Sequence, residues 1–427
     1  MSYFDCAILG GGPAGLFAAL SSAGRAGELG RPLQIAVFER NGRAGRKLLV
    51  TGGGQCNITQ DVSATDLIDH FGDHGRFLRH AVHTLPPKVT MRQFESMGLS
   101  LITREDGKVF PASLQASDVL QTLLDQCDSL GIQCIYHSRI TKVDHNDGVF
   151  TLCSGNQTVA TARTVILATG GASYPNTGST GDGYELSRSL GHTVIPPRPG
   201  LSSVAFVENS LGVCSGISLE SVSLSFTDQE GKRRQSHGPL LITHTGLSGP
   251  VVLHASRYFA VTTDLTLCWL PRDDGRPRQP AEIERSLWEL CTAHGSANLS
   301  TIVHRLGIPA RLAQWFLQVA NVDGSVKAAE VGKRVLGSVA RILAAQRLTV
   351  SLQGALKHAM VTAGGIALSE IDPKRMESRI VPGLFVAGEV LDIDGDTGGY
   401  NLQSAWSTGF LAGTCAAESV LGDSSGS

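Results

Sequence analysis

The chain has 427 residues and a formal net charge of -2, from 36 Lys and Arg against 38 Asp and Glu. This balance indicates no polyanionic partner and no acidic membrane surface, so we expect neither nucleic acid nor membrane as a partner. A chain of this length predicts two or three domains. The nine cysteines include no Cys-x-x-Cys pair, which argues against a disulfide framework or zinc ribbon. With no leader-like or membrane-length apolar run, we expect a cytoplasmic protein.

The first predicted element is a buried parallel strand over the apolar run Asp5 to Leu9. It leads at once into Gly-Gly-Gly-Pro-Ala-Gly, starting at Gly10, and then into a small-residue helix through Ser22. In such a strand–turn–helix unit, Gly10 would make the turn, Gly12 would let a pyrophosphate approach, and Gly15 would let the helix pack on the strand. The negative charge would then rest at the helix amino terminus.

A second apolar run, Gln34 to Phe38, ends in Glu39, whose carboxylate would accept hydrogen bonds from a ribose diol. The alternative is a glycine turn that only closes a bend. The acid about twenty residues beyond the glycines favours dinucleotide binding over that alternative. The position at the start of the chain favours FAD over NAD, by analogy.

Further strand patterns are scattered along the chain. We expect a hairpin of short strands over Gly131 to Asp144, and strands over Val149 to Cys153, Thr164 to Ala168 and Gly383 to Glu389. Alternating patterns between residues 196 and 275, such as Ser218 to Phe226, predict a β-rich insertion, and apolar residues at helical spacing predict helices over 276–348. The expected fold is therefore α/β: a two-dinucleotide-binding, Rossmann-like FAD domain from residues 1–195 and 349–427, with β-rich and helical insertions as a cap.

Three segments resemble a known family: Gly45 to Asn57, Thr243 to Pro250 and Gly388 to Asn401. They look like the bacterial FAD-binding flavoproteins whose members carry names such as 3-dehydro-bile acid reductase and aminoacetone oxidase. More distantly they resemble the fumarate reductase flavoproteins. The resemblance implies an FAD-dependent oxidoreductase acting on a small organic substrate. Gln55 stands where relatives often carry Arg, so its role is left open.

The resemblance leaves a second class of function open, a regulatory or RNA-associated protein in which FAD is structural. No His or Cys stands in an evident flavin-attachment motif, so the FAD is expected to be non-covalent. No second Gly-x-Gly-x-x-Gly follows a mid-chain strand, so NAD(P)H, if it is the donor, would visit transiently a site shared with the substrate.

The residues expected to contact FAD come from four segments. Lys47 and the backbone of Thr51 to Gly53 would lie near the pyrophosphate and the ring, unless this glycine loop is only a mobile surface loop. Glu389 would hold the ribityl hydroxyls. The glycines before Leu402 to Ala417 would lead into a helix that stabilises negative charge on the reduced ring. The expected set is Gly10, Gly12, Pro13, Ala14, Gly15, Glu39, Arg40, Lys47, Thr51, Gly52, Gly53, Asn57, Ile140, Ala168, Thr169, Gly170, Gly388, Glu389, Gly398, Gly399, Tyr400, Asn401 and Leu402.

The candidate catalytic acids or bases are His244 and Tyr400, with Ser248 and Tyr174 as further possibilities. A lone His in an apolar segment is often structural, which is the alternative for His244.

Two other features suggest chemistry that we do not expect. Cys56 beside the glycine loop lacks a nearby resolving thiol and is expected to be a small buried side chain. The alternating acids from Asp392 to Asp396 are interpreted as a solvated surface turn, and no metal is expected.

Overall fold

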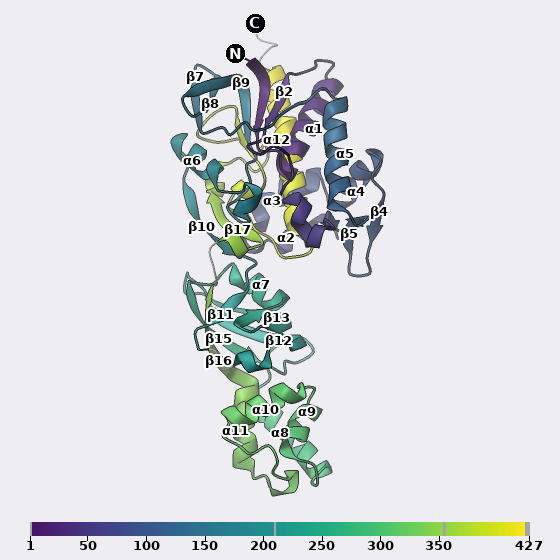
Figure 1. The fold of residues 1–427 in the computed structure, drawn as a ribbon, viewed down its shortest axis with the longest axis vertical. Coiled ribbons are helices and arrows are strands. Elements are labelled where there is room, and N and C mark those ends of the chain that lie inside the picture. Colours follow the sequence, from purple (N-terminus) through teal and green to yellow (C-terminus); the bar gives the residue numbers. More distant parts are fainter. Residues whose placement is uncertain (1, 209–210, 353–355, 423–427) are drawn as a thin grey trace. The chain divides into compact units, whose positions relative to one another are not determined.

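The computed structural model describes residues 2–208, 211–352 and 356–422. The chain forms two compact units (Figure 1). The first combines the two ends of the chain, residues up to 198 and from 356 onward, and the second is formed by residues 199–355. Among the described residues, no helix is long and apolar enough to cross a bilayer.

The first unit is built on a seven-stranded sheet in the order β6-β2-β1-β9-β8-β7, with β18 also pairing with β9. Strands β6, β2, β1, β9 and β18 run parallel, and β8 and β7 continue the sheet antiparallel. The Rossmann-like α/β fold expected from the sequence is confirmed. The strand bounds are β1 Ser2–Leu9, β2 Ile35–Phe38, β6 Gln133–Ile135, β7 Lys142–Asn146, β8 Val149–Ser154, β9 Gln157–Leu167 and β18 Leu384–Val386.

The hairpin expected over Gly131 to Asp144 is wrong. Strand β6 pairs in parallel with β2, whereas β7 pairs with β8. β6 and β7 thus have different partners. The helix that precedes β6 is a crossover connection, and it returns the chain to the edge of the parallel sheet beside β2.

Helices α1 (Pro13–Glu28) and α12 (Tyr400–Gly422) lie side by side against this sheet (Figure 1). A Cβ atom added at Gly409 would lie 2.3 Å from the carbonyl oxygen of Ala14, and one added at Gly413 would lie 2.1 Å from that of Ala18. The two glycines thus allow the backbones of α1 and α12 to come into contact, so the carboxyl-terminal helix packs against the amino-terminal one. Helix α1 also continues beyond Ser22, where it was expected to end.

The remaining elements of the first unit surround this core. Its other helices are α2 Ala64–Asp69, α3 Gly75–Thr84, α4 Pro87–Ser96, α5 Ala116–Ser129 and α6 Asp182–Ser189. A three-stranded sheet has the order β3-β5-β4, and β10 pairs with β17. These strands are β3 Thr59–Gln60, β4 Leu101–Thr103, β5 Lys108–Pro111, β10 Val194–Gly200 and β17 Val361–Ile366.

The second unit contains a closed barrel in the order β11-β14-β13-β12-β15-β16, together with helices. The strands are β11 Val204–Phe206, β12 Ser218–Thr227, β13 Arg233–Ile242, β14 Gly246–Ser248, β15 Thr262–Cys268 and β16 Gln346–Leu352. The helices are α7 Pro250–Ser256, α8 Pro280–Ala293, α9 Leu299–Arg305, α10 Ala310–Val319 and α11 Lys333–Ala345.

Barrel and helices share one hydrophobic core, in which Leu224 and Leu265 of the barrel pack with Ile283, Phe316 and Leu343 of the helices. The expected boundary at residue 275 therefore falls inside a single unit. Strand β16 closes the barrel between β15 and β11, although most of it was assigned to the FAD domain. A closed barrel needs a strand that pairs with both of its remaining edges. Helix α11 leads directly into β16, which takes that position.

Candidate functional site

A cavity lies at the carboxyl ends of the parallel strands of the first unit, where open α/β sheets bind ligands. It encloses about 1370 Å³ of empty space, including its open mouth. Its wall extends from the first glycine turn and Glu39 to Asn401 and Leu402 at the start of α12. The expected contact residues that line it are Gly10, Gly12, Pro13, Ala14, Glu39, Arg40, Lys47, Thr51, Ile140, Ala168, Thr169, Gly170, Gly388, Glu389, Asn401 and Leu402.

Other expected residues are not part of the cavity wall. All residues that line the cavity belong to the first unit, and the candidate His244 lies in the second, in the turn between β13 and β14. The contact and catalytic roles of the residues away from the wall stay predictions. They are Gly15, Gly52, Gly53, Asn57, Gly398, Gly399, Tyr400 and His244.

The glycines of the first turn occupy three different environments. Gly10 has φ +113°, and a Cβ atom there would lie 2.4 Å from the carbonyl oxygen of Ala168. A Cβ atom at Gly15 would lie 1.9 Å from the carbonyl oxygen of Gly10, so the packing of helix on strand requires a glycine there. One at Gly12 would meet nothing within 4 Å. The space over Gly12 is therefore open to a ligand.

Helix α1 begins at this open space and is suited to an anion. Gly12 provides no side-chain cap, Pro13 is the first helical residue, and the first turn contains no acidic side chain. The amides of a helix's first turn lack intrahelical partners, and the helix dipole favours negative charge there. In addition, the buried hydroxyl oxygen of Thr169 on the cavity wall has no hydrogen-bond partner among the residues that the structure describes. These observations fit a bound pyrophosphate.

Glu39 is held at the end of β2 by backbone amides. Its Oε2 accepts a hydrogen bond from the Gly11 amide at 3.0 Å. Its Oε1 accepts bonds from the Asn41 amide at 2.8 Å and the Asn41 side chain at 2.7 Å. The carboxylate is only 8% exposed and is part of the cavity wall. Oε1 uses both of its lone pairs on Asn41, and Oε2 keeps one, so Oε2 can accept a hydrogen bond from a hydroxyl of the ribose diol expected there.

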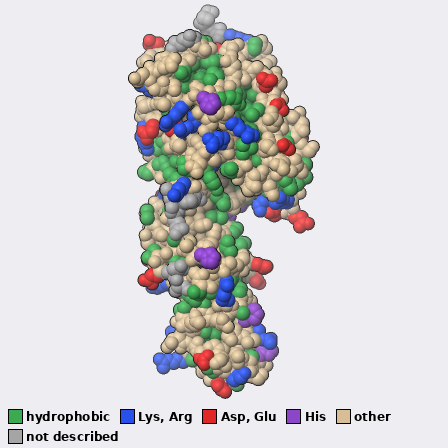
Figure 2. All heavy atoms as spheres, viewed as in Figure 1, with side chains coloured by type: hydrophobic (Ala, Val, Ile, Leu, Met, Phe, Trp, Pro, Cys, Tyr) green, Lys and Arg blue, Asp and Glu red, His purple; other side chains and the backbone are tan. Residues whose placement is uncertain are grey.

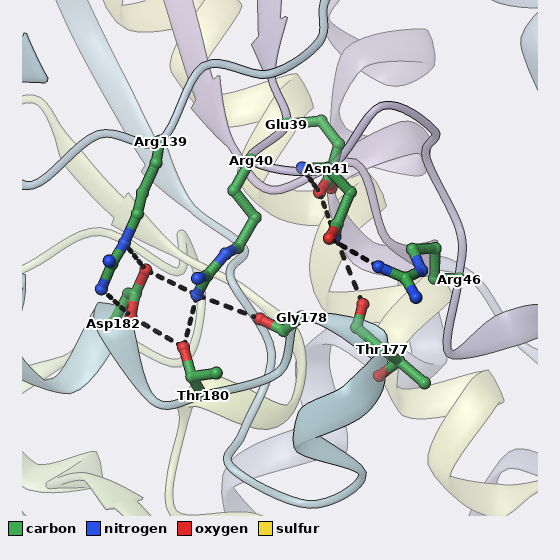
Figure 3. A network of polar contacts seen from close by, with 9 residues as sticks. All are labelled: Glu39, Arg40, Asn41, Arg46, Arg139, Thr177, Gly178, Thr180 and Asp182. Atoms are coloured by element: carbon green, nitrogen blue, oxygen red, sulfur yellow. Dashed lines mark hydrogen bonds and ion pairs between the residues drawn. The ribbon is translucent and has the colours of Figure 1, made fainter.

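A polar network joins the end of β2 to the 177–182 segment (Figure 3). Arg139 places Nε and Nη2 at 2.8 and 2.9 Å from the two carboxylate oxygens of Asp182. The Nη1 atom of Arg40 lies 2.9 Å from Oδ2 of the same carboxylate, and the Asn41 side chain donates to the carbonyl oxygen of Thr177. Since residues of this segment line the cavity, the network fixes the wall beside Glu39.

The charge of Asp182 is stabilised by these contacts. Partial burial acts to raise the pKa of Asp182, but hydrogen bonds from Arg139 and Thr180 and the two nearby guanidinium groups lower it below the usual range. Basic side chains are common here: Arg40, Arg46, Lys47 and Arg139 all line the cavity. On the face drawn in Figure 2, Lys and Arg side chains gather over the middle of the first unit.

Lys47 and Glu389 form an ion pair within the cavity, with Nζ 2.6 Å from Oε2. Ser173 lies 2.6 Å from the ammonium group and donates to Oε1 of Glu389 at 2.9 Å. The Thr362 amide also donates to Oε1. The sequence predicted a contact of Lys47 with the pyrophosphate and ring and a contact of Glu389 with the ribityl hydroxyls, and both roles stay predictions. It did not predict the ion pair between the two side chains. The sequence signal for Ser173 is its position directly after the glycines that follow β9.

The glycine loop holds two side chains that the sequence left open. Cys56 is fully buried, and burial raises the pKa of its thiol to about 12. The thiol is therefore protonated and unreactive at neutral pH, which agrees with the expected small buried side chain. Gln55 accepts a hydrogen bond from Arg104 at 2.8 Å, and the Arg104 guanidinium lies 3.9 Å from the ring centroid of Phe110. An arginine from the β4–β5 hairpin therefore lies beside the loop.

The acidic run before α12 is not a solvated surface turn, and that interpretation is wrong. Asp394 is only 5% exposed. His70 lies 2.9 Å from Asp396, and His74 lies 3.8 Å from Asp392. The segment between α2 and α3 lies against this loop, with the Phe71 ring beside Gly395. Within the part of the chain that the structure describes, no group of three or more His, Cys, Asp or Glu is arranged to hold a metal.

Residues 4–415 match the family described as the HI0933-like protein Rossmann domain. The chain belongs to this family of FAD-binding oxidoreductases, and its cavity and fold agree with that class.

Three relatives with assigned activities are similar over nearly the whole chain. The 3-dehydro-bile acid delta(4,6)-reductase of Clostridium scindens is 30% identical over 96% of this chain and 98% of its own length. The ribosomal RNA dihydrouridine synthase of Haemophilus influenzae is 30% identical, covering 96% and 97% of the two chains, and that of Escherichia coli is 30% identical over 100% of both. The bile acid reductase confirms that part of the expected resemblance, and the name aminoacetone oxidase stays a prediction.

Solved structures support the fold. The 3-ketosteroid delta1-dehydrogenase of Sterolibacterium denitrificans has a TM-score of 0.51 at 13% identity, covering 98% of this chain and all of that one. A quinol-fumarate reductase with menaquinol has a TM-score of 0.50 at 19% identity, covering 98% and 71%. At this identity the likeness concerns the fold alone.

Proposed function

We propose that the protein is an FAD-dependent reductase that adds two hydrogens across a carbon–carbon double bond conjugated to a carbonyl group. The observation that carries the proposal is a shared chemistry in the names of the relatives. A delta(4,6)-reductase of a 3-dehydro steroid and a synthase of dihydrouridine both saturate a ring double bond conjugated to a carbonyl. This chain is equally similar to both, so the reaction type is the part that they have in common.

The chain's own residues would hold the cofactor along the cavity. Gly12 and the first turn of α1 would bind the pyrophosphate, Glu39 would bind the ribose, and the first turn of α12, with Asn401 and Leu402 on the cavity wall, would face the flavin end. Bound FAD would supply two-electron chemistry, taking a hydride from a donor and passing it to an acceptor.

NAD(P)H is the proposed donor, without a binding domain of its own. No second glycine motif of the dinucleotide type follows a mid-chain strand in the sequence. Donor and acceptor would therefore take turns at the same ring. We expect ping-pong kinetics with parallel double-reciprocal lines, and high donor concentrations should inhibit competitively against the acceptor. Intersecting lines together with a stable ternary complex would contradict a shared site.

A small organic enone is the first candidate acceptor, and a uridine in ribosomal RNA is the second. Two observations favour the second enough to test it. Two relatives of matching length carry the RNA activity in their names. Residues 199–355 also contain 15 Lys and Arg against 12 Asp and Glu, whereas the rest of the chain is net acidic. A basic unit attached to a flavin unit is an arrangement that RNA could use.

One assay separates these candidates. Purified protein with FAD is given NADH or NADPH and either a 3-oxo steroid with conjugated double bonds or ribosomal RNA that lacks dihydrouridine. Mass spectrometry then follows the gain of two hydrogens, with free FAD as the background control. Steroid reduction supports the first candidate, and new dihydrouridine moves the activity to the second. If NAD(P)H reduces the flavin but neither acceptor gains hydrogen, the proposed reaction is wrong.

A further inference from the structure

Three of the four basic side chains that line the cavity of the first unit form ion pairs with carboxylates. Arg40 and Arg139 lie 2.9 and 2.8 Å from the same carboxylate oxygen of Asp182. The ammonium group of Lys47 lies 2.6 Å from Oε2 of Glu389. Most of the positive charge on the cavity wall is therefore already paired within the protein.

The fourth basic side chain, Arg46, has a different environment. Its Nη1 atom donates to the uncharged Oδ1 atom of Asn41 at 2.9 Å (Figure 3). Among the residues that the structure describes, no carboxylate forms an ion pair with its guanidinium group. Arg46 is exposed at the cavity wall, and Asn41 takes only one of its several N–H donors. The charge of Arg46 and its remaining donors are thus available to a ligand.

The backbone places Arg46 next to the first glycine turn. The amide of the preceding residue, Gly45, donates to the carbonyl oxygen of Gly11 at 2.9 Å. Gly45 has φ +67°, a conformation that favours glycine. The side chain of Asn41 donates in turn to Oε1 of Glu39 at 2.7 Å. Arg46 is therefore connected both to the turn from which α1 begins and to the acid expected to bind the ribose.

We propose that Arg46 binds the pyrophosphate of FAD. The proposal rests on the cofactor part of the proposed function. A pyrophosphate brings two negative charges, whereas the amino terminus of a helix offers only a partial positive charge. A guanidinium group matches this need, because its planar N–H donors fit the oxygens of a phosphate group. The sequence favoured Lys47 for this contact, but Glu389 already balances the charge of that lysine.

The test compares Arg46→Gln, Arg46→Lys and Arg43→Gln as full-length apoproteins. Arg43 is the matched control, because it is an exposed arginine of the same loop that does not line the cavity. Flavin fluorescence measures the Kd of FAD, and calorimetry measures those of ADP and adenosine. ADP keeps the two phosphates of the adenosine half, and adenosine has the base and ribose without phosphate.

We expect Arg46→Gln to raise the Kd of both FAD and ADP by about 10- to 150-fold, the range for lost hydrogen bonds to a charged group. The Kd of adenosine should stay within about twofold of wild type. Arg46→Lys should recover part of the loss, because it keeps the charge without the planar donors. Arg43→Gln should change none of the three constants more than about twofold.

Salt provides a second readout. Added salt screens exposed charges, so the Kd of FAD should rise more steeply with NaCl in the wild type than in Arg46→Gln. The melting temperatures of the apoproteins should be equal, because Arg46 and Arg43 are both exposed.

Wild-type affinity for FAD and ADP in Arg46→Gln would overturn the role of Arg46. An equal loss of affinity for adenosine would also overturn it, because Arg46 would then support the adenosine wall through Asn41 rather than bind phosphate. Failure of the wild-type protein to bind FAD overturns the cofactor part of the proposed function, and the role of Arg46 with it. Failure to reduce a conjugated acceptor overturns the proposed reaction alone.

Discussion

Substitution of Gly12 by alanine tests whether the first turn of α1 approaches the pyrophosphate. The residue has φ -87° and ψ -175°, which any L residue adopts, and its added Cβ atom would meet nothing within 4 Å. The protein without FAD should therefore fold with an unchanged melting temperature. With FAD, the methyl group would occupy the space over the turn and separate the backbone amides from the phosphate.

The size of the effect follows from the lost contacts. Hydrogen bonds to a charged group contribute ~1.5–3 kcal/mol, which corresponds to a rise in the FAD Kd of about 10- to 150-fold. Titration of the apoprotein with FAD, followed by flavin fluorescence, measures this change. Gly24→Ala is the matched control, because Gly24 lies in the same helix and its Cβ atom would also meet nothing within 4 Å. A Kd within about twofold of wild type for Gly12→Ala would refute the assigned approach of the pyrophosphate.

Three further predictions follow from the same geometry. Gly15→Ala should lower the melting temperature of the apoprotein in circular dichroism, because its Cβ atom would lie 1.9 Å from the Gly10 carbonyl oxygen and overpacking costs ~1–3 kcal/mol; an unchanged melting temperature would show that helix and strand are not in contact there. Cys56→Ser should retain full turnover, and the native thiol, whose pKa burial raises to about 12, should resist thiol reagents until the protein unfolds. Asp182→Asn should speed FAD dissociation several-fold at neutral pH by freeing the 177–182 segment from Arg139. Because the pKa of Asp182 is lowered in the folded protein, its contribution is present at neutral pH and is lost only as the pH falls through that lowered pKa, so dissociation rates of wild type and variant should converge in acid.

Local patterns in the sequence predicted the cofactor-binding half of this protein. The strand, the glycine turn, the helix and Glu39 all lie within the first 40 residues, and each depends on backbone conformation and hydrophobic periodicity at its own position. The cavity wall contains 16 of the residues expected to contact FAD. Turn chemistry and strand periodicity are short-range properties, which is why the sequence alone was enough for them.

Tertiary structure decided which distant residues meet. Lys47 and Glu389 are 342 positions apart, and His70 and Asp396 are 326 apart, so no periodicity or motif spacing relates them. They meet because α1 packs against α12 through glycines and brings the two ends of the chain into one unit. The pairing of β6 with β2, and of β16 with β15 and β11, likewise depends on which strand edges the rest of the fold leaves unpaired. Pairing of this kind depends on where whole elements dock, and that is a property of the packed core.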